Sequence, residues 1–213
     1  MLFFNIQESD LRTFTNPMRC VSDHIMMVSK FVLMSQFAHR TDVLPSSPSI
    51  SIEENGRHRM NIHSVNKTCS VIFPFSMIET EDSELKYTFG PFNVISSTIN
   101  SALANVSYQI KQNSADSFSS ILDIIYENDI LGCEQDIELL SQIVFWFYKE
   151  ESGHVRYDHD LKNSNGTIHP EHHLDINYRN QNSFKIGLRS ELEHQSFYDL
   201  FAKSKPCHYL HIE

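Results

Sequence analysis

Histidine side chains crowd into the final part of this chain. Eight of the twelve histidines fall within residues 151–213. An imidazole has an ordinary pKa of about 6.5, so near neutral pH it can accept a proton, donate one or bind a metal ion. Five of the histidines stand close together and are followed by an aspartate: His154, His159, His169, His172, His173 and Asp175. This crowding indicates a site for acid–base or metal chemistry.

Two strands that fold back on each other would position these side chains. The sequence predicts a hairpin with its turn at Asn163-Ser164-Asn165-Gly166, because these residue types favour turns. Alternate residues of a strand face opposite sides. One face then carries His173, Asp175 and Asn177, and the other carries His172, Leu174, Ile176 and Tyr178. The apolar members of the second set indicate that it faces the core, so the first set is expected to look outward or into a cleft.

The partner strand of this hairpin adds the remaining candidate groups. According to the register, it brings either Arg156 and Asp158 or Tyr157 and His159 beside the His173 face. In the catalytic interpretation a histidine acts as general acid or base, an aspartate fixes its tautomer, and an arginine neutralises an anionic group such as a phosphate. Phosphodiester or nucleotide chemistry fits that set. The candidate catalytic residues are His169, His173, Asp175, Arg156 and Asp158.

Two other interpretations of the same residues stay open. They could be hydrogen-bonded polar side chains on a solvated hairpin, since His and Asp are common at strand ends and turns. They could also bind a divalent metal ion through His169, His173 and Asp175, although this spacing matches no recognised ligand pattern. The sequence has no GxGxxG, P-loop, GxSxG or HExxH motif, which excludes the common nucleotide-binding, esterase and metalloprotease assignments.

The charge distribution supports a different function class. The formal net charge is −10, and residues 1–150 hold 10 Lys and Arg against 18 Asp and Glu. Such a surface opposes broad binding to a phosphate backbone, which needs many basic contacts. The alternative is therefore a non-catalytic accessory subunit whose acidic front binds a basic partner protein, encoded in the same operon. Local contact with a nucleotide or nucleic acid stays open near Arg156, Arg179, Lys185 and Arg189.

The expected location is the cytoplasm. No apolar stretch reaches the 18 residues that a membrane helix needs, and the first residues lack the basic and apolar segments of a signal peptide. The four cysteines form no CxxC pair and are expected to be reduced thiols: Cys20, Cys69, Cys133 and Cys207.

The elements that carry the site are predicted to form a single α+β domain over residues 1–213, with an acidic sheet-plus-helix part at 1–150 and a His-rich hairpin and helix at 151–213. Hydrophobic periodicity predicts an N-terminal helix at 18–38, antiparallel hairpin strands near 48–73 around Asn55-Gly56, central helices within 93–148, and C-terminal antiparallel strands within 153–188. The capping-box pattern Ser190-Glu191-Leu192-Glu193 predicts the start of a terminal helix, and Cys207 to His211 a final edge strand.

The last third of the chain resembles an uncharacterised bacterial family, domain of unknown function 2290. The resemblance rests on Arg156-Tyr157-Asp158, on His169-Pro170-Glu171-His172-His173-Leu174 and on the later Phe184-Lys185-Ile186. The matching positions of its His-Pro-x-x-His-Leu stretch are His169, Pro170, His173 and Leu174. Lys185-Ile186-Gly187 departs from the Arg-Ile-Pro turn of that pattern. The resemblance implies a bacterial intracellular protein of mobile-element, defence or toxin–antitoxin type, and it implies no established activity.

Overall fold

One antiparallel sheet runs through the molecule. The structure is a computed structural model that describes residues 2–16, 18–45, 48–53, 58–91, 93–115, 117–127, 131–150, 152–177, 183–202 and 205–206. The strands of this sheet are Leu2–Asn5 (β1), Arg40–Thr41 (β2), Ser49–Glu53 (β3), Arg59–His63 (β4), Lys67–Ile72 (β5), His154–His159 (β9), His172–Asn177 (β10) and Ser183–Leu188 (β11). They lie in the order β11-β10-β9-β5-β4-β3-β1-β2. Pairing of β5 with β9 therefore joins the N-terminal strands to the His-rich hairpin.

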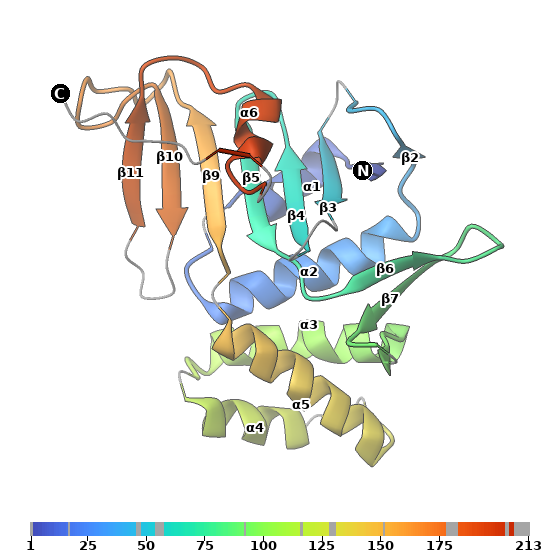
Figure 1. Cartoon of the computed structure of the whole chain (residues 1–213). Helices are drawn as coiled ribbons and strands as arrows, with labels where there is room; N and C mark the ends of the chain where they lie inside the picture. Colours follow the sequence, from blue (N-terminus) through green and yellow to red (C-terminus); the bar gives the residue numbers. More distant parts are fainter. Residues whose placement is uncertain are drawn as a thin grey trace.

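Helices cover the two faces of this sheet unequally. Their bounds are Glu8–Thr15 (α1), Val21–Ser35 (α2), Ser97–Gln112 (α3), Phe118–Tyr126 (α4), Glu134–Lys149 (α5) and His194–Asp199 (α6). In Figure 1, α2 crosses beneath the sheet with α3, α4 and α5 beyond it, whereas α6 lies in front of the sheet. Of the helices that the structure describes, none combines the length and the apolar character that a membrane crossing requires.

A second, smaller sheet projects from the body of the molecule. It is formed by Ser76–Glu79 (β6), Leu85–Phe89 (β7) and Asn93–Val94 (β8), in the order β6-β7-β8. The hairpin of β6 and β7 extends outward as an arm (Figure 1). Its connection carries three exposed acidic residues, Glu81, Asp82 and Glu84.

The apolar side chains of the sheet change faces where β5 meets β9. In β1, β3, β4 and β5 most of the apolar residues point toward α2, and the ring of Phe4 lies 5.2 Å from that of Phe31 on α2. Phe3 is an exception, because its ring contacts that of His63 on the opposite face. Residues that lie opposite each other in the ladder share a face, and Cys69 of this core lies opposite Arg156. The first charged residue of the predicted site therefore stands on the α2 face, where the neighbouring strands are apolar.

The opposite face of β9, β10 and β11 has its own apolar core against α6. Tyr157, Leu174, Phe197 and Tyr198 are its buried members. On the same side of the sheet, β3, β4 and β5 carry buried polar side chains: Ser51, Asn61, His63, Thr68 and Ser70. The hydroxyl of Tyr198 bonds to the His63 ring and Thr68 Oγ1 lies 3.1 Å from His194 Nδ1, so α6 binds this polar patch as well as its apolar core.

The sequence-based prediction of an α+β fold is confirmed. The hairpin strands at 48–73, the helices within 93–148, the strands within 153–188 and the terminal helix are all present. The predicted capping box is wrong: α6 begins at His194 with Glu193 as its N-cap, and no side-chain bond caps it. The turn at Asn55-Gly56 and the strand at Cys207 to His211 lie outside the described residues.

Of the described cysteines, Cys20 and Cys133 are exposed, Cys69 is buried, and all three are unpaired.

Helix α3 offers a direct test of local stability. The side chain of Ser96 caps it by accepting a hydrogen bond from the backbone N–H of Ile99 at 3.1 Å. We expect Ser96→Ala to lower the free energy of unfolding by about 1 kcal/mol, because this N–H loses its acceptor. Chemical denaturation measures the change. Ser97→Ala is the matched control, since Ser97 is exposed in the first turn, and an equal loss from both variants would contradict the capping role.

Candidate functional site

The register of β9 and β10 brings the predicted residues together. Asp175 lies opposite Arg156, and His173 lies opposite Asp158. Of the two registers that the sequence left open, the structure therefore has the one that pairs Arg156 and Asp158 with the His173 face. All four side chains point toward the α2 face of the sheet. The pairing of β10 with β11 adds a fifth, because Lys185 lies opposite Asp175.

Arg156 is the centre of a buried ion network. Its Nε and Nη2 atoms donate to the two carboxylate oxygens of Asp158 at 2.8 and 2.7 Å, and Nη2 also donates to Asp175 at 2.6 Å. Burial lowers the pKa of Arg156, but the hydrogen bond and the charge of Asp158 outweigh it, so the net shift is upward. The guanidinium therefore remains charged and holds both carboxylates in fixed positions.

The imidazole of His173 has a defined tautomer. Its Nδ1 lies 2.8 Å from the carbonyl oxygen of Pro170, and its Nε2 lies 2.9 Å from the Nζ atom of Lys185. A carbonyl oxygen can only accept a hydrogen bond, and an ammonium group can only donate one. His173 is therefore neutral with its proton on Nδ1, and Nε2 presents a lone pair to Lys185. The same ammonium donates to Asp175 at 2.7 Å.

His169 is the outermost of the five predicted residues. It lies in the connection between β9 and β10, and its ring stands edge-on to that of His173 at 4.8 Å. Its Nε2 lies 3.4 Å from Asp160, outside hydrogen-bond geometry. The side chain of His169 is 28% exposed, whereas His173 has no exposed surface. His169 therefore contacts the ion network through His173 and is the histidine of the pair that reaches solvent.

The His173 face, which the sequence predicted to look outward or into a cleft, is buried. Arg156, Asp158, His173 and Asp175 are all buried. The end of α1 and the hairpin connection close over them: Arg156 Nη1 donates to the carbonyl of Thr15 at 3.4 Å, and Pro170 packs so tightly on Gly187 that a Cβ there would lie 2.8 Å from it. Burial is tolerated because the two carboxylates face two cations, Arg156 and Lys185, so the network is electrically balanced.

The network reaches solvent through Lys185, and a cavity lies near its other side. The side chain of Lys185 is 35% exposed and reaches solvent at the edge of the hairpin. On the other side, a cavity of about 470 Å³ is lined by residues that include Arg12, Thr15 and Lys67. Thr15 is the backbone acceptor of Arg156, and Lys67 lies opposite Asp158 in the ladder. The basic side chains of Arg12 and Lys67 and the acidic side chain of Glu8 line this cavity, and the buried charges lie behind Thr15 and Lys67.

The thiol of Cys69 lies beside this network but is not a nucleophile. It stands opposite Arg156 and is fully buried. Burial raises the pKa of Cys69 to about 12, so its thiol stays protonated at neutral pH. The chemistry of the site therefore belongs to its imidazoles, carboxylates and basic side chains.

The described residues contain two groups whose donor atoms lie close enough to share a metal ion. Asp158, His173 and Asp175 form the buried group, and His159, Glu171 and His172 form a group on the opposite face of the sheet. Arg156 and Lys185 already neutralise the carboxylates of the buried group. His169, which the sequence suggested as a ligand beside His173 and Asp175, is a member of neither group.

Sequence reasoning missed two features of this region. Lys185 was considered only as a basic residue near the site, although period-two alternation along β11 could have placed it beside Asp175. His172 was assigned to the core face, and its pairing with His159 follows from the same register that pairs Arg156 with Asp175.

Comparison of the chain with protein-family models, curated proteins and solved structures gives no match. The functional argument therefore depends on the chemistry of the site itself.

Proposed function

We propose that this protein performs phosphodiester or nucleotide chemistry at the hairpin site, with His169 and Lys185 as the groups that contact the substrate. The observation that carries the proposal is that Lys185 and His169, which both reach solvent, contact the same buried imidazole, that of His173. Lys185 Nζ lies 2.9 Å from His173 Nε2, and the ring of His169 lies 4.8 Å from that of His173. A cation for a phosphate oxygen and an imidazole for proton transfer therefore both contact the ring of His173.

Each group has a role that its surroundings support. Lys185 would bind a non-bridging phosphate oxygen as a compact cation. His169 would accept a proton from the attacking hydroxyl or water, or donate one to the leaving oxygen. His173, Asp175, Asp158 and Arg156 act as positioning residues, because they hold Lys185 and the His169 ring without reaching the solvent. The bacterial defence or toxin–antitoxin setting belongs to this proposal and depends on the C-terminal resemblance alone.

The proposal is tested by assaying the purified full chain on single- and double-stranded DNA and RNA and on free nucleotides. We expect His169→Asn and Lys185→Met each to lower the rate of cleavage at least about 100-fold, because the first removes a proton-transfer group and the second a cation that stabilises developing charge. His39→Asn and Lys86→Met are the matched controls, because both residues are exposed outside the site and should leave the rate unchanged. Unfolding midpoints verify that the variants are folded. Equal rates for the site variants and the controls would refute the catalytic assignment.

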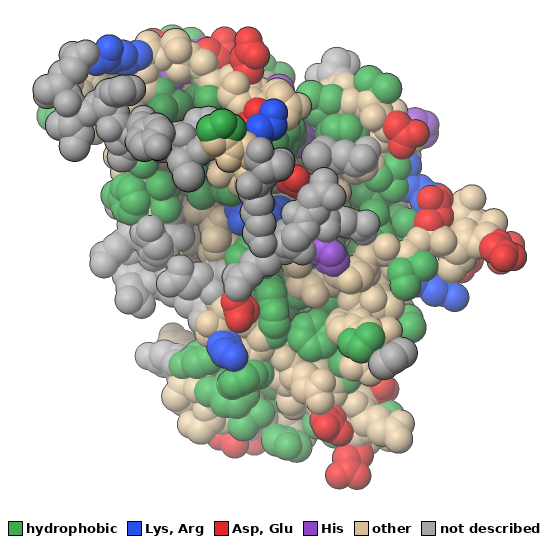
Figure 2. All heavy atoms as spheres, viewed as in Figure 1, with side chains coloured by type: hydrophobic (Ala, Val, Ile, Leu, Met, Phe, Trp, Pro, Cys, Tyr) green, Lys and Arg blue, Asp and Glu red, His purple; other side chains and the backbone are tan. Residues whose placement is uncertain are grey.

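A second candidate function is a non-catalytic accessory subunit. The observation that favours it is the complete mutual pairing of the buried charges, which is what a purely structural network requires. The partner-binding surface would then be acidic, and Figure 2 shows acidic side chains at the tip of the β6–β7 arm, where Glu81, Asp82 and Glu84 are exposed. Reversing these three charges should abolish cellular activity in this case, while His169→Asn and Lys185→Met leave it intact.

A further inference from the structure

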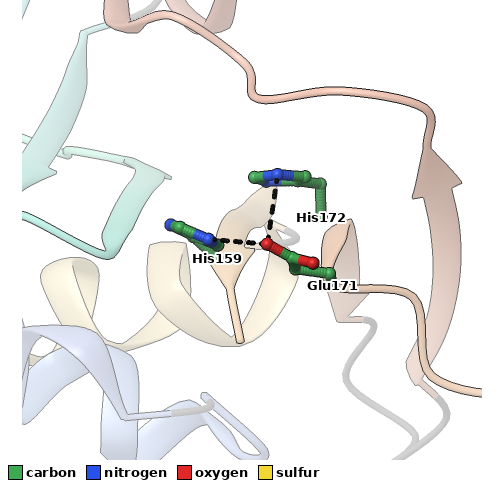
Figure 3. Close-up of side chains that lie close together, drawn as sticks. All are labelled: His159, Glu171 and His172. Carbon is green, nitrogen blue, oxygen red and sulfur yellow. Dashed lines mark hydrogen bonds and ion pairs between the residues drawn. The ribbon is translucent and has the colours of Figure 1, made fainter. Parts of the chain in front are cut away.

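The second group of donor atoms lies at the end of the β9–β10 ladder, on the α6 face. His159 and His172 are directly opposite each other in the register, and Glu171 precedes His172 in the chain. Figure 3 shows the Glu171 carboxylate pointing between the two imidazoles. One of its oxygens lies 3.0 Å from His159 Nε2 and 3.7 Å from His172 Nε2. Two imidazole nitrogens and one carboxylate oxygen therefore converge on one point from the ends of two neighbouring strands.

These separations suit a bound zinc ion. Two ligand atoms that each lie about 2.05 Å from a tetrahedral ion are about 3.3 Å apart. The separations of 3.0 and 3.7 Å fall on either side of this value, and all three donor atoms lie within 4.8 Å of one another. Small rotations of the side chains would therefore complete the coordination. Two histidines and one glutamate are a ligand set that zinc enzymes use.

The backbone around the group is held in place before any ion binds. The N–H of His159 donates to the carbonyl of Asn66 at 3.0 Å, and the N–H of Asp160 donates to the carbonyl of Glu171 at 2.8 Å. The imidazoles of His159 and His172 are stacked, with centroids 4.5 Å apart. Little conformational entropy would be lost on binding, because both histidines are on a paired ladder and not on a loose loop.

Tyr157 forms a hydrogen bond with the ring nitrogen of His172 that does not face Glu171. Its hydroxyl oxygen lies 2.8 Å from His172 Nδ1. When this oxygen accepts the Nδ1 proton, Nε2 of His172 keeps its lone pair and points it toward Glu171. Metal-ligating histidines commonly use their second nitrogen in this way, and loss of the partner weakens metal binding. Tyr157 therefore orients one of the three ligands.

The two groups of donor atoms differ in whether their carboxylates already pair with a lysine or an arginine. The carboxylates of Asp158 and Asp175 already bond to Arg156 and Lys185, so an ion there would have to displace a buried cation. Within the described part of the chain, the ion pairs of Glu171 are with His159 and His172. The side chains of His159, Glu171 and His172 are 26%, 43% and 18% exposed, so an ion can enter from solvent.

We propose that His159, Glu171 and His172 form a binding site for one Zn²⁺ ion. His159 Nε2, His172 Nε2 and a carboxylate oxygen of Glu171 are its protein ligands, and the remaining coordination position faces solvent. In the metal-free protein the Nε2–H of His159 donates to Glu171 at 3.0 Å, and on Zn²⁺ binding this proton moves to Nδ1 or is released to solvent. The site lies on the other face of the sheet from Arg156 and does not depend on the proposed catalytic function.

The test is calorimetric titration of the metal-free full chain with Zn²⁺, together with Co²⁺ absorption spectra that report a tetrahedral ligand field. We expect about one ion per chain, and at least about 100-fold weaker binding in the double variant His159→Ala/His172→Ala. Tyr157→Phe should weaken binding about 10-fold, because the ion's ligands remain but one loses its orienting partner. Glu171→Gln, which keeps the shape of the side chain, should also weaken binding and alter the Co²⁺ spectrum.

The control is His39→Ala, which removes an exposed histidine far from the group in sequence and should bind Zn²⁺ as the wild type does. Melting temperatures without metal verify that all variants are folded. The proposal is overturned if the wild type takes up no Zn²⁺, if the double variant binds as tightly as the wild type, or if His39→Ala loses as much affinity. No readout uses catalysis, so failure here leaves the hairpin-site proposal untouched, and the reverse also holds.

Discussion

Replacing Arg156 by methionine is expected to lower the free energy of unfolding by about 3–5 kcal/mol. The arginine holds the carboxylates of Asp158 and Asp175, and both side chains are less than 10% exposed. Without the guanidinium, Asp158 loses three hydrogen bonds and neither carboxylate can reach bulk water. Methionine fills much of the same volume, so the loss reports the uncompensated charge and not a cavity. Urea denaturation monitored by fluorescence and circular dichroism measures it.

Arg40→Met is the matched control for this experiment. Arg40 donates to Glu79 at 2.9 Å, but this ion pair is exposed, with Glu79 53% accessible. Such pairs contribute less than about 1 kcal/mol, because water and salt screen them. A second variant, Arg156→Met/Asp158→Asn, removes the carboxylate that loses its cation partner, since Asp175 keeps Lys185, and should recover part of the loss. If Arg156→Met costs no more than Arg40→Met, the network does not stabilise the hairpin in the way we describe.

Stability is expected to fall steeply as the pH is lowered from about 6.5 to 3. Burial lowers the pKa of His63 to about 3, with the neighbouring His194 adding to the shift, and burial with the charge of Arg156 does the same for His154. In the unfolded chain these histidines titrate near 6.5, so between the two values the unfolded state binds more protons. Each histidine therefore removes up to about 1.4 kcal/mol per pH unit within this window, and its contribution is fully present above pH 6.5.

Urea unfolding at pH values from 7.5 to 4 measures this dependence. His63→Gln should flatten the profile, since the amide keeps a polar contact for the Tyr198 hydroxyl and does not titrate. His39→Gln should leave the profile as it is in the wild type, because His39 is exposed. A wild-type free energy of unfolding that stays constant from pH 6.5 to 4 would show that neither buried histidine resists protonation.

Much of the fold follows from local patterns in the sequence. Alternating apolar and polar residues predicted β3 and β4, and helical periodicity predicted α2, α3 and α5. The elements that were missed are short or lack such a pattern. β1 has only three consecutive apolar residues, α1 has few apolar residues, and β6 and β8 are short. β7 does alternate apolar and polar residues, but over only five positions. Their formation depends on tertiary pairing that a local window does not contain.

The composition of the site was predictable, but its surroundings were not. The alternation rule placed His173 with Asp175, yet only the register of β9 and β10 decides that Arg156 joins them. Because these residues are polar, the sequence suggested that their face looks outward or into a cleft. The structure buries them, because arginine and lysine balance the carboxylates and because Pro170 fits over Gly187. Charged residues that are distant in the sequence neutralise each other only in the packed structure, so no periodic pattern in the sequence reveals their pairing.

Pairing of β5 with β9 has a consequence for how the chain folds. The two strands are adjacent in the sheet, but all of residues 73–153, with the projecting arm and three helices, lie between them in the sequence. Closing so long a loop is entropically unfavourable, and native contacts of this separation slow folding. The intervening helices can form first, because their contacts are local. The zipping of β9 onto β5 is then expected to limit the overall rate, and until it occurs the exposed edge of β5 is open to pairing with another chain.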